Sequence, residues 1–207
     1  RKIAIESSFS LGSSGRSASP LTASGIGRYP LSFSDDQQKY LSSILHSFPI
    51  TSLVSQFLNG IIPHCSKVLG WYSYTDSQSP SDHDYRRSLA QEFHIDFEGP
   101  SFLKLFVYLT PVSAYSGPHQ IFSHKGDTLP KKIREFERSL GLGISVIPDE
   151  LVAPFLGNSG HVSSILGPRN TMFLVDTSRP HRGLAPLKNH GRLVLSTTFR
   201  ISNLGNP

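Results

Sequence analysis

Apolar and polar residues alternate along residues 91–97, which read Gln-Glu-Phe-His-Ile-Asp-Phe. On a β-strand, successive side chains point to opposite faces, so His94 and Asp96 share one face. The apolar residues share the other face and are expected to enter a hydrophobic layer; they are Phe93, Ile95 and Phe97. The pattern therefore predicts a half-buried strand that presents an imidazole and a carboxylate side by side.

Further apolar runs predict the other strands of the protein. They occupy residues 68–74, 102–110, 119–122, 171–176 and 192–199. The run at 102–110 is apolar enough to lie centrally in its sheet. Fifteen prolines and 17 glycines indicate many turns, which favours a mainly β domain with flanking helices over a helical bundle.

Two helices are expected before the main sheet begins. Ser34 and Gln37 have the spacing of a capping box, and apolar residues recur at helical intervals as far as Phe48. A second helix is expected to follow Thr51 and to end before Pro63. Its apolar side consists of Leu53, Val54, Phe57, Leu58 and Ile61. Both helices are interpreted as braces that cover one face of the sheet.

The remaining segments fit a single domain. Residues 1–33 are rich in serine and glycine and are expected to form a flexible lead-in or an arm wrapped on the domain. Residues 34–207 are assigned to one domain, because a chain of 207 residues suits one domain and contains no internal repeat. A helical insertion is expected near 130–157, with helices at 130–140 and 148–156.

Composition restricts the kinds of partner. The formal net charge is +5, but the basic pairs at 86–87 and 131–132 are isolated. We therefore expect a mild preference for anionic ligands and no nucleic-acid partner. Because no apolar run is long enough to cross a membrane, no membrane partner is expected. Cys65 is the only cysteine, which excludes an intrachain disulfide and fits a reducing, cytoplasmic location.

A third metal-capable side chain is needed to complete a site with His94 and Asp96. The best candidate is His181, in the run Arg-Pro-His-Arg-Gly at residues 179–183. Two histidines and one carboxylate on one side of a metal leave open coordination positions, which is typical of non-haem Fe(II) oxygenases. The run Asp-His-Asp at 82–84 also offers metal ligands, but it lies in a polar stretch without periodicity and is interpreted as a solvated loop.

The order His94-x-Asp96, His181 and Arg192 resembles the Fe(II)/2-oxoglutarate-dependent dioxygenase superfamily, and within it the phytanoyl-CoA dioxygenase-like branch. The resemblance covers residues 68–202 and is carried by the segments 90–96, 103–110, 116–118 with 123–126, and 181–183 with 191–192. The chain departs from the pattern of that branch in two places. The segment between 117 and 123 is shorter and lacks the usual Pro-Gly, and Lys104 stands where relatives often carry a polar residue such as Asn.

This resemblance implies a double-stranded β-helix, a cupin-like jelly roll, that binds Fe(II) and uses 2-oxoglutarate and O2 as cosubstrates. It implies hydroxylation of a C–H bond of a small organic substrate, with release of succinate and CO2. The metal-binding and catalytic residues would be His94, Asp96 and His181, and Arg192 would hold the far carboxylate of 2-oxoglutarate bidentately. The remaining implied contacts are Tyr108 and Lys104 for the cosubstrate, and Gln91 and Arg182 for the substrate.

Two other functions are compatible with the sequence. A non-catalytic, cupin-like binding module would keep the fold, but its metal ligands are expected to decay, whereas all four expected positions are filled here. A metalloenzyme on the same fold that does not use 2-oxoglutarate would have no need of Arg192. Neither the identity of the substrate nor the oligomeric state is encoded in a motif.

Overall fold

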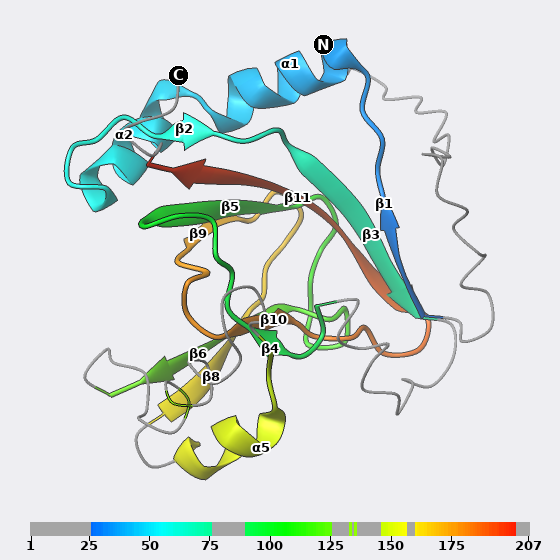
Figure 1. Ribbon diagram of the computed structural model, residues 1–207. Helices are drawn as coiled ribbons and strands as arrows, with labels where there is room; N and C mark the ends of the chain where they lie inside the picture. The colour runs from blue at the N-terminus through cyan, green and yellow to red at the C-terminus, as the bar shows by residue number, and fades with distance from the viewer. Residues whose placement is uncertain are drawn as a thin grey trace.

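The computed structural model describes residues 26–75, 90–125, 133, 135, 146–156 and 160–201. Within these residues the strands form two antiparallel sheets, a larger one of six strands and a smaller one of five. Figure 1 shows the sheets as two layers, with helices on the outer side of each. The architecture is therefore mainly β with flanking helices, as the sequence predicted.

The larger sheet contains the longest strands. In spatial order they are β1 (Ile26–Pro30), β3 (Leu69–Thr75), β11 (His190–Arg200), β5 (Phe102–Tyr108) and β9 (Met172–Val175), and β2 (His64–Cys65) pairs with the end of β11. The apolar strand β5 lies between two others, which confirms its predicted central place. Residues 26–30, assigned from the sequence to a flexible or wrapped lead-in, form an edge strand of this sheet. Residues 1–25 lie outside the described part of the chain.

The smaller sheet contains shorter strands. In order they are β7 (Val146–Ile147), β4 (Phe93–His94), β10 (His181–Gly183), β6 (His119–His124) and β8 (Gly160–Ile165). The strand expected at 91–97 is thus only two residues long. Phe93 and Ile95 are buried as predicted, but Phe97 is 77% exposed, so that part of the prediction is wrong. The chain leaves the sheet after His94, and the burial alternation continues only as far as Asp96.

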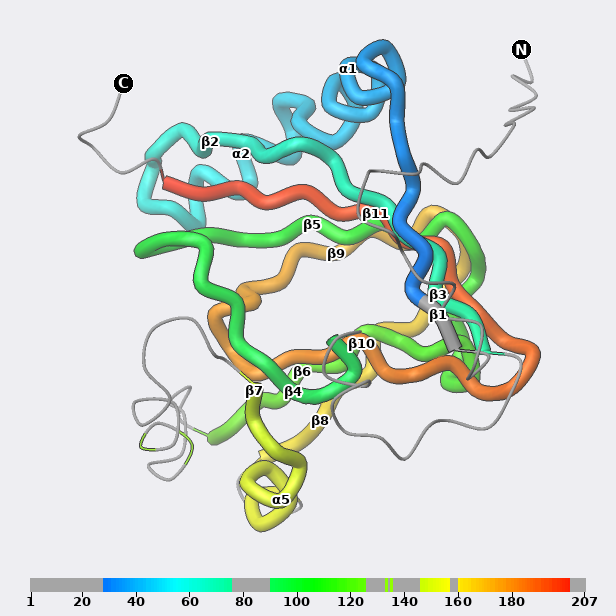
Figure 2. Tube along the Cα trace, turned by 45° about the vertical axis from the view of Figure 1, so that its right-hand side comes forward, coloured from blue at the N-terminus to red at the C-terminus, as the bar shows by residue number. Residues whose placement is uncertain are grey.

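Helices α1 (Asp35–Leu45) and α2 (Phe48–Phe57) cover the outer face of the larger sheet, as both views show (Figures 1 and 2). The capping box is confirmed, since the Ser34 hydroxyl accepts from the Gln37 amide and the Gln37 side chain accepts from the Ser34 amide. The second helix begins before Thr51, because Pro49 suits the first turn of a helix. Of the five residues predicted for its apolar side, two are buried and three are exposed. Val54 and Leu58 are buried, whereas the exposed members are Leu53, Phe57 and Ile61.

Apolar side chains pack on both faces of the larger sheet. On the helix side the cluster includes Leu45, Val54, Leu58, Leu103, Leu105, Val107 and Leu195. Between the two sheets a second cluster contains Phe106, Tyr108, Val112, Val175 and Val194. The alternation of strands β5 and β11 therefore divides their side chains between a helix-covered face and a face that looks toward the smaller sheet.

The short helix α5 (Asp149–Val152) and the 3-10 turn η1 (Ala153–Phe155) cover the outer face of the smaller sheet. They confirm the helix expected at 148–156. Of the helix expected at 130–140, only Ile133 and Glu135 belong to the described residues, and Ile133 is fully buried in the same cluster as Phe93. No helix in the described ranges is both long and apolar enough to span a bilayer.

Candidate metal centre

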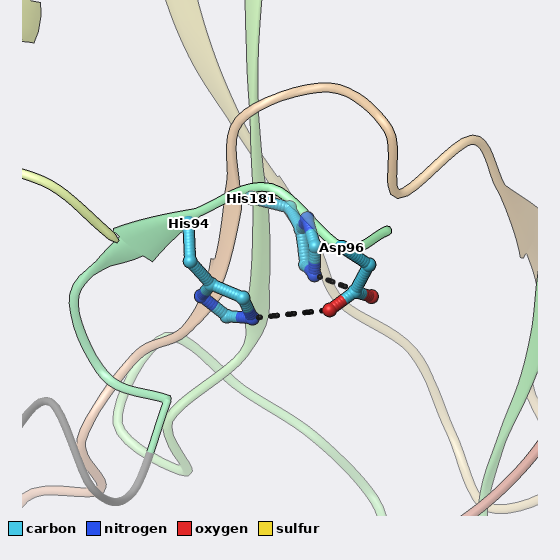
Figure 3. A group of neighbouring side chains, drawn as sticks. All are labelled: His94, Asp96 and His181. Atoms are coloured by element: carbon cyan, nitrogen blue, oxygen red, sulfur yellow. Dashed lines mark ion pairs between the residues drawn. The ribbon is translucent and has the colours of Figure 1, made fainter. Parts of the chain in front are cut away.

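The pairing of β4 with β10 brings His94 and His181 together. The two residues are direct partners in the antiparallel register, so their side chains leave the smaller sheet on the same face. Asp96 follows two residues after His94, and its backbone amide donates to the Thr177 carbonyl at 2.9 Å, which holds the carboxylate beside both rings. Figure 3 shows the three side chains converging from these two segments.

The distances within this group suit a single metal ion. The Asp96 carboxylate oxygens lie 3.9 Å from His94 Nε2 and 3.4 Å from His181 Nε2, and the two ring centroids are 4.2 Å apart. The three candidate ligand atoms all lie within 4.8 Å of one another. The predicted residues are therefore brought together, although His181 lies more than 80 positions after His94 and Asp96 in the chain.

Backbone carbonyls orient both imidazoles. Nδ1 of His94 lies 2.9 Å from the Glu92 carbonyl oxygen, and Nδ1 of His181 lies 2.9 Å from the Arg179 carbonyl oxygen. A carbonyl oxygen only accepts hydrogen bonds, so each Nδ1 carries the proton and donates. Each Nε2 then keeps its lone pair and faces the group, which is the tautomer that a metal ligand requires.

Electrostatics also favour the metal-binding protonation states. Burial, together with the neighbouring His181, lowers the pKa of His94 from 6.5 to about 4, so this ring is neutral at physiological pH. Burial alone would raise the pKa of Asp96, but His181, whenever its ring is protonated, and the ammonium of Lys104 hold that pKa below its usual range through hydrogen bonds and charge. A neutral imidazole beside an ionised carboxylate is ready to take a cation without first losing a proton.

Lys104 reaches this group from the larger sheet. Its Nζ lies 2.8 Å from Asp96 Oδ2 and 3.0 Å from Glu98 Oε1. The sequence predicted a cosubstrate contact for Lys104, and the residue does line the cavity beside the histidines. Its partners in the described structure are these two carboxylates, so the ammonium fixes the orientation of Asp96.

Arg192 lies across the cavity, on β11 of the larger sheet. Its side chain is 6% exposed, and its Nε and Nη1 atoms have no hydrogen-bond partner in the described structure. Burial lowers the pKa of this guanidinium to about 10, which leaves it charged at neutral pH. A buried charge without a partner is costly. The donors of Arg192 therefore fit an anion in the cavity.

The cavity between the sheets has a volume of about 350 Å³. Of the residues singled out from the sequence, its walls include His94, Asp96, His181, Arg192, Lys104 and Gln91. Gln91 is buried, and its Oε1 has no partner among the described residues. Two of the predicted contacts do not line the cavity, namely Tyr108 and Arg182.

Tyr108 and Arg182 have other roles in the structure. The Tyr108 hydroxyl donates to the Ile165 carbonyl and accepts from the His119 amide, both at 3.0 Å, which ties the larger sheet to the smaller one. Arg182 lies on the outer face of the smaller sheet. Its guanidinium stacks 4.1 Å from the centre of the Phe93 ring and bonds Asp149 at 2.9 Å.

Three cavity residues were not recognised from the sequence as parts of a site. His119 on β6 is buried with no partner for Nε2, and its ring centroid lies 5.4 Å from that of His181. Burial and the nearby His181 and Arg192 lower the pKa of His119 well below its usual value, so the ring is neutral. Arg28 and Trp71 also line the cavity. Arg28 falls in the supposed lead-in, where no local pattern distinguishes it.

Comparisons with known proteins support the fold. No family model matches this sequence, and no curated protein does. The chain is similar to the crystal structure of AviO1 from Streptomyces viridochromogenes Tue57, with 11% identity and a TM-score of 0.51 over 87% of this chain and 68% of that one. It is also similar to EctD from S. alaskensis, solved with bound Fe, with 13% identity and a TM-score of 0.51. That match covers 80% of this chain and 54% of EctD, so the chain spans about half of EctD.

A third similar structure is EvdO2 from Micromonospora carbonacea var. aurantiaca, complexed with 2-oxoglutarate, with 15% identity and a TM-score of 0.48 over 88% of this chain and 70% of that one. At these identities the matches to AviO1 and EctD establish a common fold. They confirm the fold implied by the resemblance to the Fe(II)/2-oxoglutarate oxygenases, whereas placement in the phytanoyl-CoA dioxygenase-like branch stays a prediction. This chain is thus built on the cupin-like double-stranded β-helix.

Proposed function

We propose that this protein is an Fe(II)- and 2-oxoglutarate-dependent oxygenase that hydroxylates a C–H bond of a small organic substrate and releases succinate and CO2. The observation that carries the proposal is the pairing, across one cavity, of a His-Asp-His group with the buried, unpartnered donors of Arg192. A planar guanidinium holds a carboxylate bidentately. A dicarboxylate can therefore bind Arg192 with one carboxylate and a metal held by the His-Asp-His group with the other.

The triad residues suit ferrous iron. Two neutral imidazole nitrogens and one carboxylate are the donor set of non-haem Fe(II) oxygenases, and EctD, which shares the fold, was solved with bound Fe. The backbone carbonyls that accept from each Nδ1 raise the basicity of the ligating nitrogen and fix its direction. When bound, Fe(II) supplies O2 activation coupled to the oxidative decarboxylation of 2-oxoglutarate.

The protein's own residues bind and orient the reactants. Arg192 holds the far carboxylate of 2-oxoglutarate, and Gly183 leaves space for the guanidinium. Lys104 fixes the Asp96 carboxylate, so its part in cosubstrate binding is indirect. Gln91 offers a buried, unpaired amide oxygen as an acceptor for a donor group on the substrate. These roles place the cosubstrate between the two sheets.

The carboxylate at position 96 favours hydroxylation over halogenation. A halide needs a coordination position next to the iron, and a small residue in place of the acid would vacate it. Asp96 would occupy that position when Fe(II) is bound, and Lys104 and the bond from its own backbone amide to Thr177 fix the carboxylate for that role. Placement in the phytanoyl-CoA dioxygenase-like branch rests on the motif spacing and is part of the proposal.

Anaerobic titration tests the proposal. Fe(II) is added to the metal-free protein with and without 2-oxoglutarate, and a metal-to-ligand absorption band is expected only when both are present. In the matched variant Arg192→Gln the band should require far more 2-oxoglutarate. Fe(II) binding without the band would favour a metalloenzyme that does not use 2-oxoglutarate, and absence of Fe(II) binding would favour a non-catalytic module. A substrate screen by succinate release then tests oxygenation.

A further inference from the structure

A second arginine faces the cavity from the same sheet as Arg192. Arg28 on β1 is the register partner of Ser73 on β3, and Ser73 is the register partner of Arg192 on β11. Residues directly opposite each other on neighbouring strands point to the same face, so all three side chains face the smaller sheet. Two strand spacings separate the backbones of the two arginines by about 10 Å. The guanidiniums are thus neighbours along one wall of the cavity.

Trp71 holds the Arg28 side chain in place. The guanidinium carbon lies 4.1 Å from the centre of the indole ring, and Trp71 also lines the cavity. Stacking on an indole uses the face of the guanidinium and leaves its edge donors available. Within the described ranges, Arg28 makes no hydrogen bond or ion pair, although burial lowers its pKa and Arg192 repels it. The charge of Asp96 acts on Arg28 through space and opposes the effect of burial on its pKa, but no anion lies within bonding distance of this positioned, partly buried cation among the described residues.

The charges of the proposed enzyme leave Arg28 unbalanced. Bound Fe(II), the Asp96 carboxylate, dianionic 2-oxoglutarate and Arg192 together carry no net charge. Lys104 is balanced by Glu98, at 3.0 Å. Asp96 attracts Arg28 in the metal-free protein, but bound Fe(II) would offset that carboxylate, so Arg28 is left as the unbalanced cation of the loaded cavity and its repulsion with Arg192 persists unless an anion lies beside it.

We propose that Arg28, stacked on Trp71, binds an oxyanion of the substrate, so that the substrate is a carboxylate or a phosphate ester. The inference rests on the proposed function, because it assigns the other charges of the cavity to Fe(II) and 2-oxoglutarate. It deepens that function by naming the class of substrate. The oxyanion accepts hydrogen bonds from the N–H groups at the edge of the guanidinium, and the rest of the substrate extends toward the metal centre.

The single tryptophan of the chain provides a direct probe, because Trp71 is the residue on which Arg28 stacks. The protein is saturated with 2-oxoglutarate and Zn(II), a redox-inert stand-in for iron. Benzoate, phenyl phosphate and the neutral benzamide are then titrated while tryptophan fluorescence is followed. Benzoate or phenyl phosphate is expected to bind at least tenfold more tightly than benzamide, because a charge-assisted hydrogen bond is stronger than a neutral one. The tighter of the two anions identifies the carboxylate or phosphate class.

Variants separate this site from the cosubstrate site. Arg28→Gln should remove the preference for anions and leave the affinity for 2-oxoglutarate within a factor of about three, while Arg28→Lys should retain part of the preference. Equal binding of benzoate, phenyl phosphate and benzamide to the wild-type protein overturns the proposal. So does a loss of 2-oxoglutarate affinity in Arg28→Gln as large as in Arg192→Gln, because Arg28 would then bind the cosubstrate.

A metal-free control makes the two proposals distinguishable. If 2-oxoglutarate does not bind the Zn(II)-loaded protein, the proposed function fails. The same anions are then titrated into metal-free Arg192→Gln protein, where Arg28 is the remaining cavity arginine among the described residues. Retained anion binding there, abolished by adding Arg28→Gln, supports an oxyanion site regardless of the oxygenase chemistry, and its absence overturns the site. Unchanged thermal unfolding of each variant shows that the fold is intact.

Discussion

Replacement of Gly183 by alanine tests how the cavity positions Arg192. A Cβ atom at position 183 would overlap Nη2 of Arg192, while the next atoms lie at ordinary contact distances, at 3.5 Å for Arg192 Cζ and 3.8 Å for the Ala90 carbonyl oxygen. The backbone of Gly183 does not have a positive φ, so alanine fits its conformation. The substitution therefore acts on one group, the guanidinium, which must move away from β10.

The expected size of the effect follows from the bond that is lost. Removing one partner of a buried, hydrogen-bonded charge pair costs about 2–5 kcal/mol. Gly183→Ala displaces the guanidinium without deleting it, so the lower end applies, and a cost of about 2 kcal/mol corresponds to a roughly 30-fold rise in the Kd for 2-oxoglutarate. The affinity for Fe(II) alone should change far less, because the nearest metal ligand, His181, keeps its bond to the Arg179 carbonyl.

The assay is an anaerobic titration of 2-oxoglutarate into the Fe(II)-loaded protein, combined with a double-mutant cycle. Arg192→Lys retains the positive charge but removes the guanidinium. The lysine variant therefore has no Nη2 atom for the alanine methyl group at position 183 to displace. Gly183→Ala should therefore cost much less in the Arg192→Lys background than in the wild type, and the two changes should be clearly non-additive. Additive effects would show that Gly183 and Arg192 act independently. An equal loss of Fe(II) and 2-oxoglutarate affinity would show that alanine distorts β10 itself.

Three further predictions concern the metal centre. Asp96→Ala should abolish succinate formation and weaken Fe(II) binding with the thermal unfolding transition retained; full turnover would mean that another acid is the ligand. Lys104→Met should raise the pKa of Asp96 toward its usual value, measured by carboxyl NMR titration of the metal-free protein, because Lys104 helps to lower it. The metal-free protein should lose stability as the pH falls from 6.5 to about 4, because unfolded His94 takes up a proton before the folded form does. The free energy of unfolding is measured with urea at several pH values. His94→Asn should reduce its change with pH by up to about 1.4 kcal/mol per pH unit, and an unchanged pH dependence would contradict the assigned pKa.

Sequence patterns correctly predicted the features that depend on neighbouring residues, such as helix capping and the alternation of side chains along a strand. The Ser34 and Gln37 capping box needs only four consecutive residues, and it is present as expected. The face shared by His94 and Asp96 follows from strand alternation, although the strand ends sooner than its apolar pattern indicates. The same rule, applied to β10, places His181 and Gly183 inward and Arg182 outward. The alternation of side chains along the strand therefore argued against the substrate contact assigned to Arg182.

Features that depend on distant pairing were harder to predict. Tyr108 shares a face with Lys104, but its hydroxyl meets the backbone of β8 and β6, and that contact depends on how the sheets stack. Arg28 lies in a short segment with glycine and proline neighbours, and only the register with β3 places it on the cavity wall. His119 has no metal ligand at a recognisable spacing, and its place beside His181 comes from the pairing of β6 with β10.

The two sheets contribute different halves of the candidate site. The smaller sheet supplies the two histidine ligands through one register pair, and Asp96 follows directly after β4, while the larger sheet supplies the cations that face them. Phe106 on the larger sheet contacts the His119 ring of the smaller sheet at a centroid distance of 4.8 Å, so apolar packing sets the gap that a dicarboxylate must span. Metal affinity therefore depends mainly on the histidine pair of the smaller sheet, with Lys104 of the larger sheet orienting Asp96, whereas cosubstrate affinity depends on the distance between the two sheets. Variants in the apolar layer, such as Phe106→Leu, should alter 2-oxoglutarate binding more than Fe(II) binding, whereas equal effects would mean that the two sheets do not act as separate supports.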